Sequence, residues 1–208
     1  MNAPVPVVRV VDDDASFLTA VARLLRASGL AARTFASVAD FLAGAELDMP
    51  GCVLVDLQMP GLSGLDLQEA LAKAGHRLPV IFLSGHADIP TTVKAMRRGA
   101  EDFLTKRAPK EELLEAVRRA LARDVRQRAE HVRLEALRAR FAALTPRELE
   151  VLKQVVRGKM NKQIAGDLGI HERTVKLHRT AITTKLGVHS SAELTKLWMD
   201  FAGLDASK

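Results

Sequence analysis

Residues 5–14, VPVVRVVDDD, contain the pattern that decides the fold of the N-terminal half. A run of apolar, mostly β-branched residues from Val5 to Val11 indicates a buried strand, and three aspartates end it. A segment with helical spacing of apolar residues follows and ends at Gly29. The same alternation recurs along the first 105 residues. It predicts an α/β fold with a doubly wound parallel sheet covered by helices on both faces.

The sequence predicts four further strands, each followed by a helix. The strands are expected at residues 30–35, 52–55, 80–83 and 103–104, and the helices at 37–44, 64–74, 90–98 and after Pro109. Functional residues of such a fold follow the strands, at their carboxyl ends. The residues at those places are Asp12 and Asp13, Asp56, Ser84 and Lys106.

Taken one at a time, these carboxylates have ordinary explanations. Asp12, Asp13 and Asp14 precede a helix, where acids cap free N–H groups, and Asp56 precedes a Pro/Gly turn. Neighbouring strand ends meet in a parallel sheet, however, and three acids so close repel one another unless a divalent cation binds. Oxygen ligands favour Mg²⁺. Ser84 and Lys106 would then contact phosphoryl oxygens, which predicts attack of a carboxylate on phosphorus.

The basic charge is concentrated in the C-terminal part of the chain. Residues 1–120 hold 14 basic and 15 acidic side chains, whereas residues 144–208 hold 11 and 7, as expected where a module meets a polyanion. The single cysteine, Cys52, excludes a disulfide framework. We find no apolar run long enough for a membrane span and no signal peptide, so we expect a cytoplasmic protein without a membrane partner.

Residues 121–141 contain no Gly or Pro and are rich in charge, which indicates a helical linker with too few apolar positions to demand a coiled coil.

Thr145-Pro146-Arg147-Glu148 combines an N-cap hydroxyl, an early proline and a glutamate three residues on, and so begins a helix. Asn161 is expected to cap a second, short helix. After a turn at Gly169, helices are expected at 172–186 and 191–201. This order is helix-turn-helix geometry.

The helix at 172–186 is expected to bury Val175, Ile182 and Leu186 along one stripe. Lys176 and Leu177 lie in its early turns and are the residues expected to contact bases, with Thr180 a further candidate. Thr174 lies on the same exposed face. The residues expected to contact DNA phosphates are Lys162, Arg179 and Lys185.

The strings VVDDD, VLVDLQMPGLSG, VIFLSGH and GAEDFLTK resemble the receiver domain of two-component response regulators, over about residues 5–120. The resemblance implies a flavodoxin-like sheet of five strands in which Asp56 is the phosphoacceptor. It also implies that Asp13, Asp56 and the backbone carbonyl of Gln58 bind Mg²⁺ directly, with Asp12 acting through water. Ser84 and Phe103 would form the switch pair, and Lys106 would hold the phosphoryl group.

The strings LTPRELEVL and NKQIAGDLGIHERTVKLHRTAITTKLGV resemble the LuxR-type DNA-binding domain, over about residues 142–204. Domain order and linker are similar to the FixJ branch of the NarL/FixJ regulators. The expected domains are a receiver (1–120), a helical linker (121–141) and a small all-α helix-turn-helix domain (142–208). The implied partners are a sensor histidine kinase, double-stranded DNA with two-fold related half-sites, a second copy of the chain after phosphorylation, and RNA polymerase.

In that dimer, Lys94, Arg97 and Arg98 of one subunit are expected to face Glu101 and Asp102 of the other.

Two positions depart from these patterns. Arg107 follows Lys106 where receivers usually have proline, often after a cis peptide bond, and His171 stands where a serine usually caps the long helix. Arg107 is the feature that favours an alternative, a transcription factor whose receiver works without phosphorylation. A second alternative is an aspartate-nucleophile phosphohydrolase. It would need a general acid where Gln58 stands, and it leaves the DNA-binding module unexplained; we therefore expect a regulator rather than an enzyme.

Overall fold

The computed structural model describes residues 4–85 and 89–205. Its first part contains a five-stranded parallel sheet with the order β2-β1-β3-β4-β5. The strands are β1 (Val7–Val11), β2 (Ala31–Phe35), β3 (Gly51–Asp56), β4 (Val80–Ser84) and β5 (Asp102–Thr105). The sequence prediction of the fold class and of all five strands is confirmed, and the strand ends differ from those expected by one or two residues.

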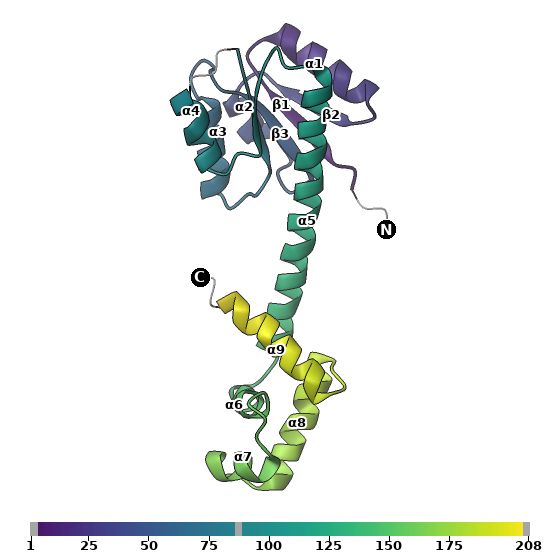
Figure 1. Cartoon of the computed structure of the whole chain (residues 1–208), viewed down its shortest axis with the longest axis vertical. Coiled ribbons are helices and arrows are strands. Elements are labelled where there is room, and N and C mark those ends of the chain that lie inside the picture. The colour runs from purple at the N-terminus through teal and green to yellow at the C-terminus, as the bar shows by residue number, and fades with distance from the viewer. Residues whose placement is uncertain (1–3, 86–88, 206–208) are drawn as a thin grey trace. The chain divides into compact units, whose positions relative to one another are not determined.

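Helices cover both faces of the sheet (Figure 1). They are α1 (Ala15–Ala27), α2 (Val38–Gly44), α3 (Gly64–Lys73), α4 (Ile89–Arg97) and α5 (Lys110–Ala142). One core lies between the sheet and α1 and α5, and includes Val10, Leu25 and Val117. The other lies between the sheet and α2, α3 and α4. β3 is buried along its whole length, which is why its sequence is continuously apolar up to Asp56.

Helix α5 is one continuous helix of 33 residues, and the chain divides into two compact units between Arg128 and Ala129 of this helix. The first unit therefore continues eight residues beyond the expected receiver end. Asp124, which is buried, accepts the Gly51 N–H at 2.9 Å and the Arg128 Nε–H at 2.9 Å. Arg128 also donates to the backbone carbonyls of Asp48 and Met49, at 2.7 and 3.2 Å. These contacts attach residues 124–128 of α5 to the loop before β3.

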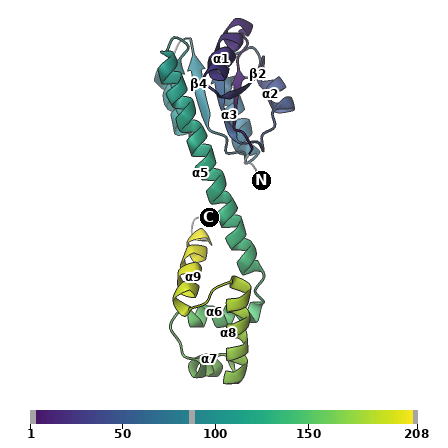
Figure 2. The same ribbon diagram turned by 90° about the vertical axis from the view of Figure 1, so that its right-hand side faces the viewer.

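The second unit packs the last turns of α5 with α6 (Pro146–Val155), α7 (Asn161–Leu168), α8 (Glu172–Leu186) and α9 (Ser191–Asp205). Figure 2 shows α8 lying against α6 and α7. Thr145 and Glu148 form the expected capping box at the start of α6, and Gly169 ends α7 in the left-handed conformation, with φ of 64°. The helix-turn-helix prediction is confirmed, with α8 over the expected residues.

The expectation that Asn161 caps α7 is wrong. The cap is Met160, which has no side-chain cap hydrogen bond, and Asn161 is the first residue of the helix. The Gln163 side chain accepts the Met160 N–H at 2.9 Å, and the Asn161 side chain accepts a hydrogen bond from Arg179 at 3.1 Å. Asn161 therefore joins α7 to α8 and does not begin α7.

We predict that Asp124→Ala destabilises the first unit by about 2–4 kcal/mol, because it leaves the Gly51 N–H and the Arg128 guanidinium without their buried partner. Urea unfolding followed by circular dichroism measures this change. The exposed control Glu115→Ala, which removes an i,i+4 pair with Arg119, should change stability by about 0.5 kcal/mol or less. Equal effects of the two substitutions would contradict the anchoring role of Asp124.

Candidate functional site

Three aspartates lie together at the carboxyl ends of β1 and β3. Asp12 and Asp13 directly follow β1, and Asp56 is the last residue of β3, which pairs with β1. One carboxylate oxygen of each lies within 4.8 Å of the others. Asp12 and Asp56 are buried, with exposed fractions of 1 % and 6 %, whereas Asp13 is exposed. The parallel pairing of the two strands therefore brings together the acids that the sequence analysis selected.

Lys106, which follows β5, places its ammonium between two of these acids. Its Nζ lies 2.7 Å from Asp12 Oδ2 and 3.1 Å from Asp56 Oδ2. The position is fixed by the main chain, because the Lys106 N–H donates to the Ser84 carbonyl at 2.9 Å. One cation thus balances part of the negative charge that the strand ends concentrate.

The pKa values of the Asp56 carboxyl and of the neighbouring Lys106 ammonium are both raised. Burial raises the pKa of the Asp56 carboxyl above its ordinary value, and the hydrogen bond and charge of Lys106 offset only part of this effect. Burial alone would lower the pKa of the Lys106 ammonium, but hydrogen bonds to Asp12 and Asp56 outweigh it and raise the pKa. Lys106 is therefore a firmly charged group beside Asp56.

The cluster fits a hard divalent cation, because its donors are carboxylate oxygens that need positive charge between them. Gln58 lies two residues beyond Asp56, and its backbone N–H offsets part of the rise in the pKa of the Asp56 carboxyl. Gly64 begins α3 against this loop, where a Cβ atom would lie 2.4 Å from the Asp56 carbonyl oxygen. The close approach of α3 to the site therefore requires glycine at this position.

Asp14 does not belong to the cluster. Its Oδ1 accepts the N–H groups of Ser16 and Phe17 at 2.8 and 3.1 Å, which makes it the N-cap of α1. Among the three consecutive acids, the capping explanation is therefore correct for Asp14.

Ser84 and Phe103 lie on the neighbouring strands β4 and β5. Ser84 is the buried last residue of β4, and Phe103 is a half-buried residue of β5 whose ring stacks on Phe82 with centroids 6.0 Å apart. His86, in the string VIFLSGH, lies outside the described residues. Arg107 is exposed, and no peptide bond between described residues is cis.

Helix α8 buries and exposes the residues that the sequence pattern indicates. Val175, Ile182 and Leu186 are at most 1 % exposed. On the opposite side, Lys176 is exposed, and Leu177 has the unusually high exposed fraction of 64 % for a leucine. Thr180 is exposed and its hydroxyl donates to the Lys176 carbonyl at 3.2 Å, while Thr174 is half-buried. His171 is the N-cap and makes no side-chain cap hydrogen bond.

The three residues expected to contact phosphates have different surroundings. Lys162 is exposed on α7. Arg179 donates to Asn161 Oδ1 at 3.1 Å and to Ser191 Oγ at 3.3 Å. Lys185 donates to both carboxylate oxygens of Glu148, at 2.7 and 3.0 Å, and so joins α8 to α6. Arg179 and Lys185 therefore hold helices together within the unit, whereas Lys162 points its charge to solvent.

The sequence analysis missed the partners of two cations. Glu148 was identified only as part of a capping box, although it also binds Lys185. Phe17 lies in the segment that the apolar spacing predicts to be helical, and that spacing does not indicate that the Lys106 ammonium lies 4.8 Å from its ring centroid. Both contacts join residues far apart in sequence, so local spacing contains no signal for them.

Comparisons with known proteins agree with this architecture. Residues 8–118 match the response regulator receiver domain, and residues 142–198 match the LuxR family of bacterial regulatory proteins. The chain is 42% identical over 197 residues to the response regulator protein TodT of Pseudomonas putida F1, covering 95% of this chain and 87% of TodT. It is 43% identical over 192 residues to the transcriptional regulatory protein FixJ of Azorhizobium caulinodans, covering 91% and 90%.

Among solved structures, the response regulator StyR matches with a TM-score of 0.88 and 42% identity, over 94% of this chain and 98% of StyR. Fold, acidic site and helix-turn-helix unit thus define a response regulator that controls transcription. The chain belongs to the NarL/FixJ family of response regulators, with an N-terminal receiver domain and a C-terminal LuxR-type DNA-binding domain. In the described part of the chain, no helix is long and apolar enough to cross a membrane.

We predict that acid weakens the second unit through Glu148. The Lys185 ammonium holds the pKa of this buried carboxyl below its ordinary value. The pair therefore stabilises the folded state fully above the unfolded-state pKa of about 4.3 and is lost as pH falls through the lower, folded-state pKa. Trp198 is the only tryptophan and lies in this unit, so its fluorescence during thermal unfolding at stepped pH reports the effect.

Glu148→Gln should unfold at lower temperature than wild type at pH 7 and lose less stability on acidification. The exposed neighbour Glu150→Gln, which removes the pair with Arg147, should reproduce the wild-type pH dependence. An unchanged pH dependence in Glu148→Gln would contradict the role of the Glu148–Lys185 pair.

Proposed function

We propose that Asp56 accepts a phosphoryl group from a sensor histidine kinase and that this modification controls DNA binding. The observation that carries the proposal is the arrangement of Asp12, Asp13 and Asp56 within 4.8 Å of one another, with Lys106 Nζ 3.1 Å from Asp56. A carboxylate beside a cation and a divalent metal site is suited to attack phosphorus. The chain acts in the cytoplasm as a transcription regulator and not as an enzyme.

Mg²⁺ would be held by Asp13, Asp56 and the Gln58 carbonyl, with Asp12 acting through water, and when bound it neutralises charge on the acids and the phosphoryl oxygens. Asp56 attacks phosphorus through a carboxylate oxygen, and the bond between phosphorus and the donor breaks. Lys106 contacts a phosphoryl oxygen through its ammonium. Ser84 turns to the phosphoryl group, and Phe103 occupies the space behind it.

The phosphorylated chain forms a homodimer through the face of α4 and β5. Ile89, Val93 and Met96 form an exposed apolar stripe on α4, with exposed fractions of 79, 43 and 43 %. The sequence analysis expected Glu101 and Asp102 to meet the basic side chains of the other subunit. In the structure, Asp102 binds Arg119 and Glu101 binds Arg123 of the same chain, both at 2.6 Å. The apolar stripe, flanked by Lys94 and Arg97, is therefore the main contact.

The domain assignment that we propose is a receiver over 1–120, a helical linker over 121–141 and a DNA-binding domain over 142–208. The dimer presents two copies of α8 to the major grooves of two-fold related half-sites. Lys176, Leu177 and Thr180 form the exposed side that faces bases, with the half-buried Thr174 beside them, and Lys162 contacts a phosphate. RNA polymerase is the further partner expected of a transcription regulator.

We predict that the wild-type protein takes up one phosphoryl group from acetyl phosphate with Mg²⁺, and that Asp56→Asn takes up none, because an amide cannot form the acyl phosphate. Intact mass spectrometry measures the uptake, and sedimentation of the same samples should show a dimer only after phosphorylation.

Asp14→Asn is the matched control, because Asp14 caps α1 outside the cluster, and it should be modified like wild type. Modification of Asp56→Asn would place the phosphoacceptor elsewhere. A wild-type protein that binds DNA without any uptake would favour the phosphorylation-independent alternative, in which Arg107 replaces the usual proline.

On a DNA site selected by the phosphorylated protein from random sequences, Lys176→Ala should cost about 1–3 kcal/mol and weaken the preference at one base pair per half-site. Lys162→Ala should weaken specific and non-specific binding equally and reduce the salt slope by about one unit. Fluorescence anisotropy at several salt concentrations measures both. Equal losses on specific and random DNA for Lys176→Ala would identify Lys176 as a phosphate contact only.

A further inference from the structure

An aromatic ring contacts the cation of the acidic site. The Lys106 Nζ lies 4.8 Å from the centroid of the Phe17 ring, inside the roughly 6 Å range of a cation–π interaction. The same ammonium lies 2.7 Å from Asp12 and 3.1 Å from Asp56. Two carboxylates and one ring face therefore share a single, mostly buried charge, whose side chain is 21 % exposed.

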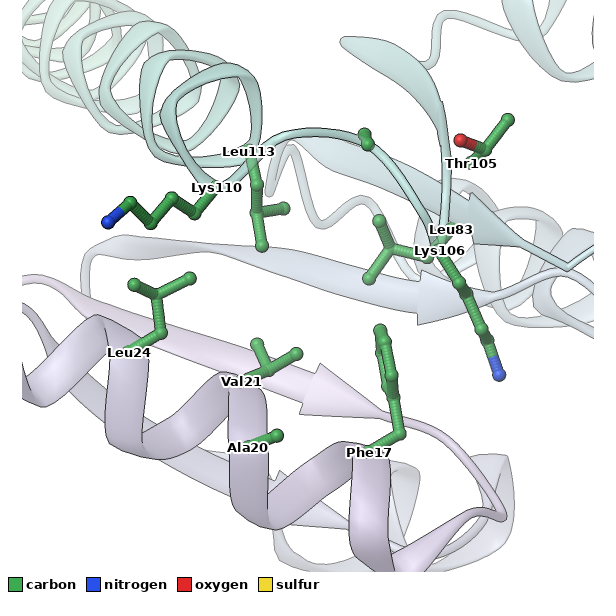
Figure 3. A pocket seen from close by; sticks show the side chains of 10 residues that line it. Phe17, Ala20, Val21, Leu24, Leu83, Thr105, Lys106, Lys110 and Leu113 are labelled. Atoms are coloured by element: carbon green, nitrogen blue, oxygen red, sulfur yellow. The ribbon is translucent and has the colours of Figure 1, made fainter.

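Phe17 itself is held in place by its own helix. Its N–H donates to the Asp14 carboxylate at 3.1 Å, and its half-buried ring packs against the core between the sheet and α1. Figure 3 shows the ring rising from the first turn of α1 beside the Lys106 side chain, at one end of a cavity. The volume of this cavity is about 170 Å³. Leu24 lies at the other end. The ring is thus a fixed surface, against which the lysine rests.

Lys106 needs such a surface because its present partners are also those of the proposed metal. A cation bound to Asp56, with Asp12 acting through water, competes with the ammonium for these carboxylates, and the four-carbon lysine side chain is flexible. A ring face attracts the charge without offering a competing carboxylate. It therefore keeps the ammonium near Asp56 while leaving it free to meet a new oxygen.

We propose that Phe17 is a positioning residue for phosphorylation, which acts by holding the Lys106 ammonium where the incoming phosphoryl oxygen arrives. The inference rests on the proposed role of Asp56. In the reaction with acetyl phosphate, an Asp56 oxygen forms a bond to phosphorus, the bond from phosphorus to the acetate oxygen breaks, and acetate leaves with the electron pair. Lys106 remains protonated throughout and supplies charge only.

The test is the rate of phosphorylation in Phe17→Leu, which keeps an apolar side chain and removes the ring face. We expect the rate with acetyl phosphate and Mg²⁺, followed by intact mass, to fall about three- to tenfold, as expected for loss of a cation–π contact. Phe17→Tyr retains a ring and should react within about twofold of wild type. Leu24→Ala removes packing from the same helix face and cavity without touching Lys106, and should react like wild type.

A double substitution separates positioning from packing. In a Lys106→Met background, Phe17→Leu should change the residual rate less than about twofold, because the partner of the ring is already gone. Ring-current shifts of the Lys106 ε-methylene protons supply a second readout that needs no reaction. These protons should be shifted in wild type and in Phe17→Tyr and lie at ordinary lysine positions in Phe17→Leu.

The outcomes distinguish this inference from the proposed function. If wild type takes up no phosphoryl group, the proposed function fails and this inference fails with it. If wild type reacts and Phe17→Leu reacts at the same rate, only the positioning role of Phe17 is overturned. The same holds if Phe17→Leu lowers the rate by the same factor in the Lys106→Met background as in wild type. An unshifted Lys106 signal in wild type would overturn it as well.

Discussion

The mutual repulsion of carboxylates at the ends of β1 and β3 is the constraint on which the site depends. A parallel sheet brings these strand ends together, so Asp12 and Asp56 are buried side by side, and their charges need a cation. Lys106 supplies it from a third strand end. Because the order of the sheet is β2-β1-β3-β4-β5, the acids occupy its centre and the lysine approaches from an edge strand. The fold thus sets the electrostatics, and the electrostatics favour a divalent cation and a phosphoryl group.

The sequence predicted what depends on chain periodicity and on strand ends. Local patterns in the sequence predict the strands, the order of the domains and the bounds of α8. They also predict the cluster of Asp12, Asp13 and Asp56, because parallel pairing brings the ends of β1 and β3 close together. It could not predict contacts between elements remote in sequence. Phe17 meets Lys106 across 89 positions, and the separation of the Glu148–Lys185 pair is 37. No periodicity specifies which side chains of two packed helices or loops will meet.

The same limit explains the position at which the first unit ends. From Leu121 onward, the charged sequence of α5 predicts a solvent-exposed helix and favours a linker. Asp124 is nevertheless buried, because it accepts the Gly51 N–H at the start of β3, and Arg128 binds the carbonyls of the preceding loop. An acid in a charged run is usually at the surface, so only the tertiary partners show that these residues of α5 pack with the first compact unit.

β3 connects the two ends of this arrangement, since its first residue binds α5 through Asp124 and its last residue is Asp56. The strand is buried throughout and paired on both sides, so it has little room to change shape. β5 differs, because it is an edge strand whose Phe103 is half-buried. Asp102, the first residue of β5, and Glu101 just before it bind Arg119 and Arg123 of α5. If Asp56 is phosphorylated as proposed, we expect the change to reach α5 more easily across the β5 edge than along β3, because partly exposed ion pairs can be replaced by water at modest cost.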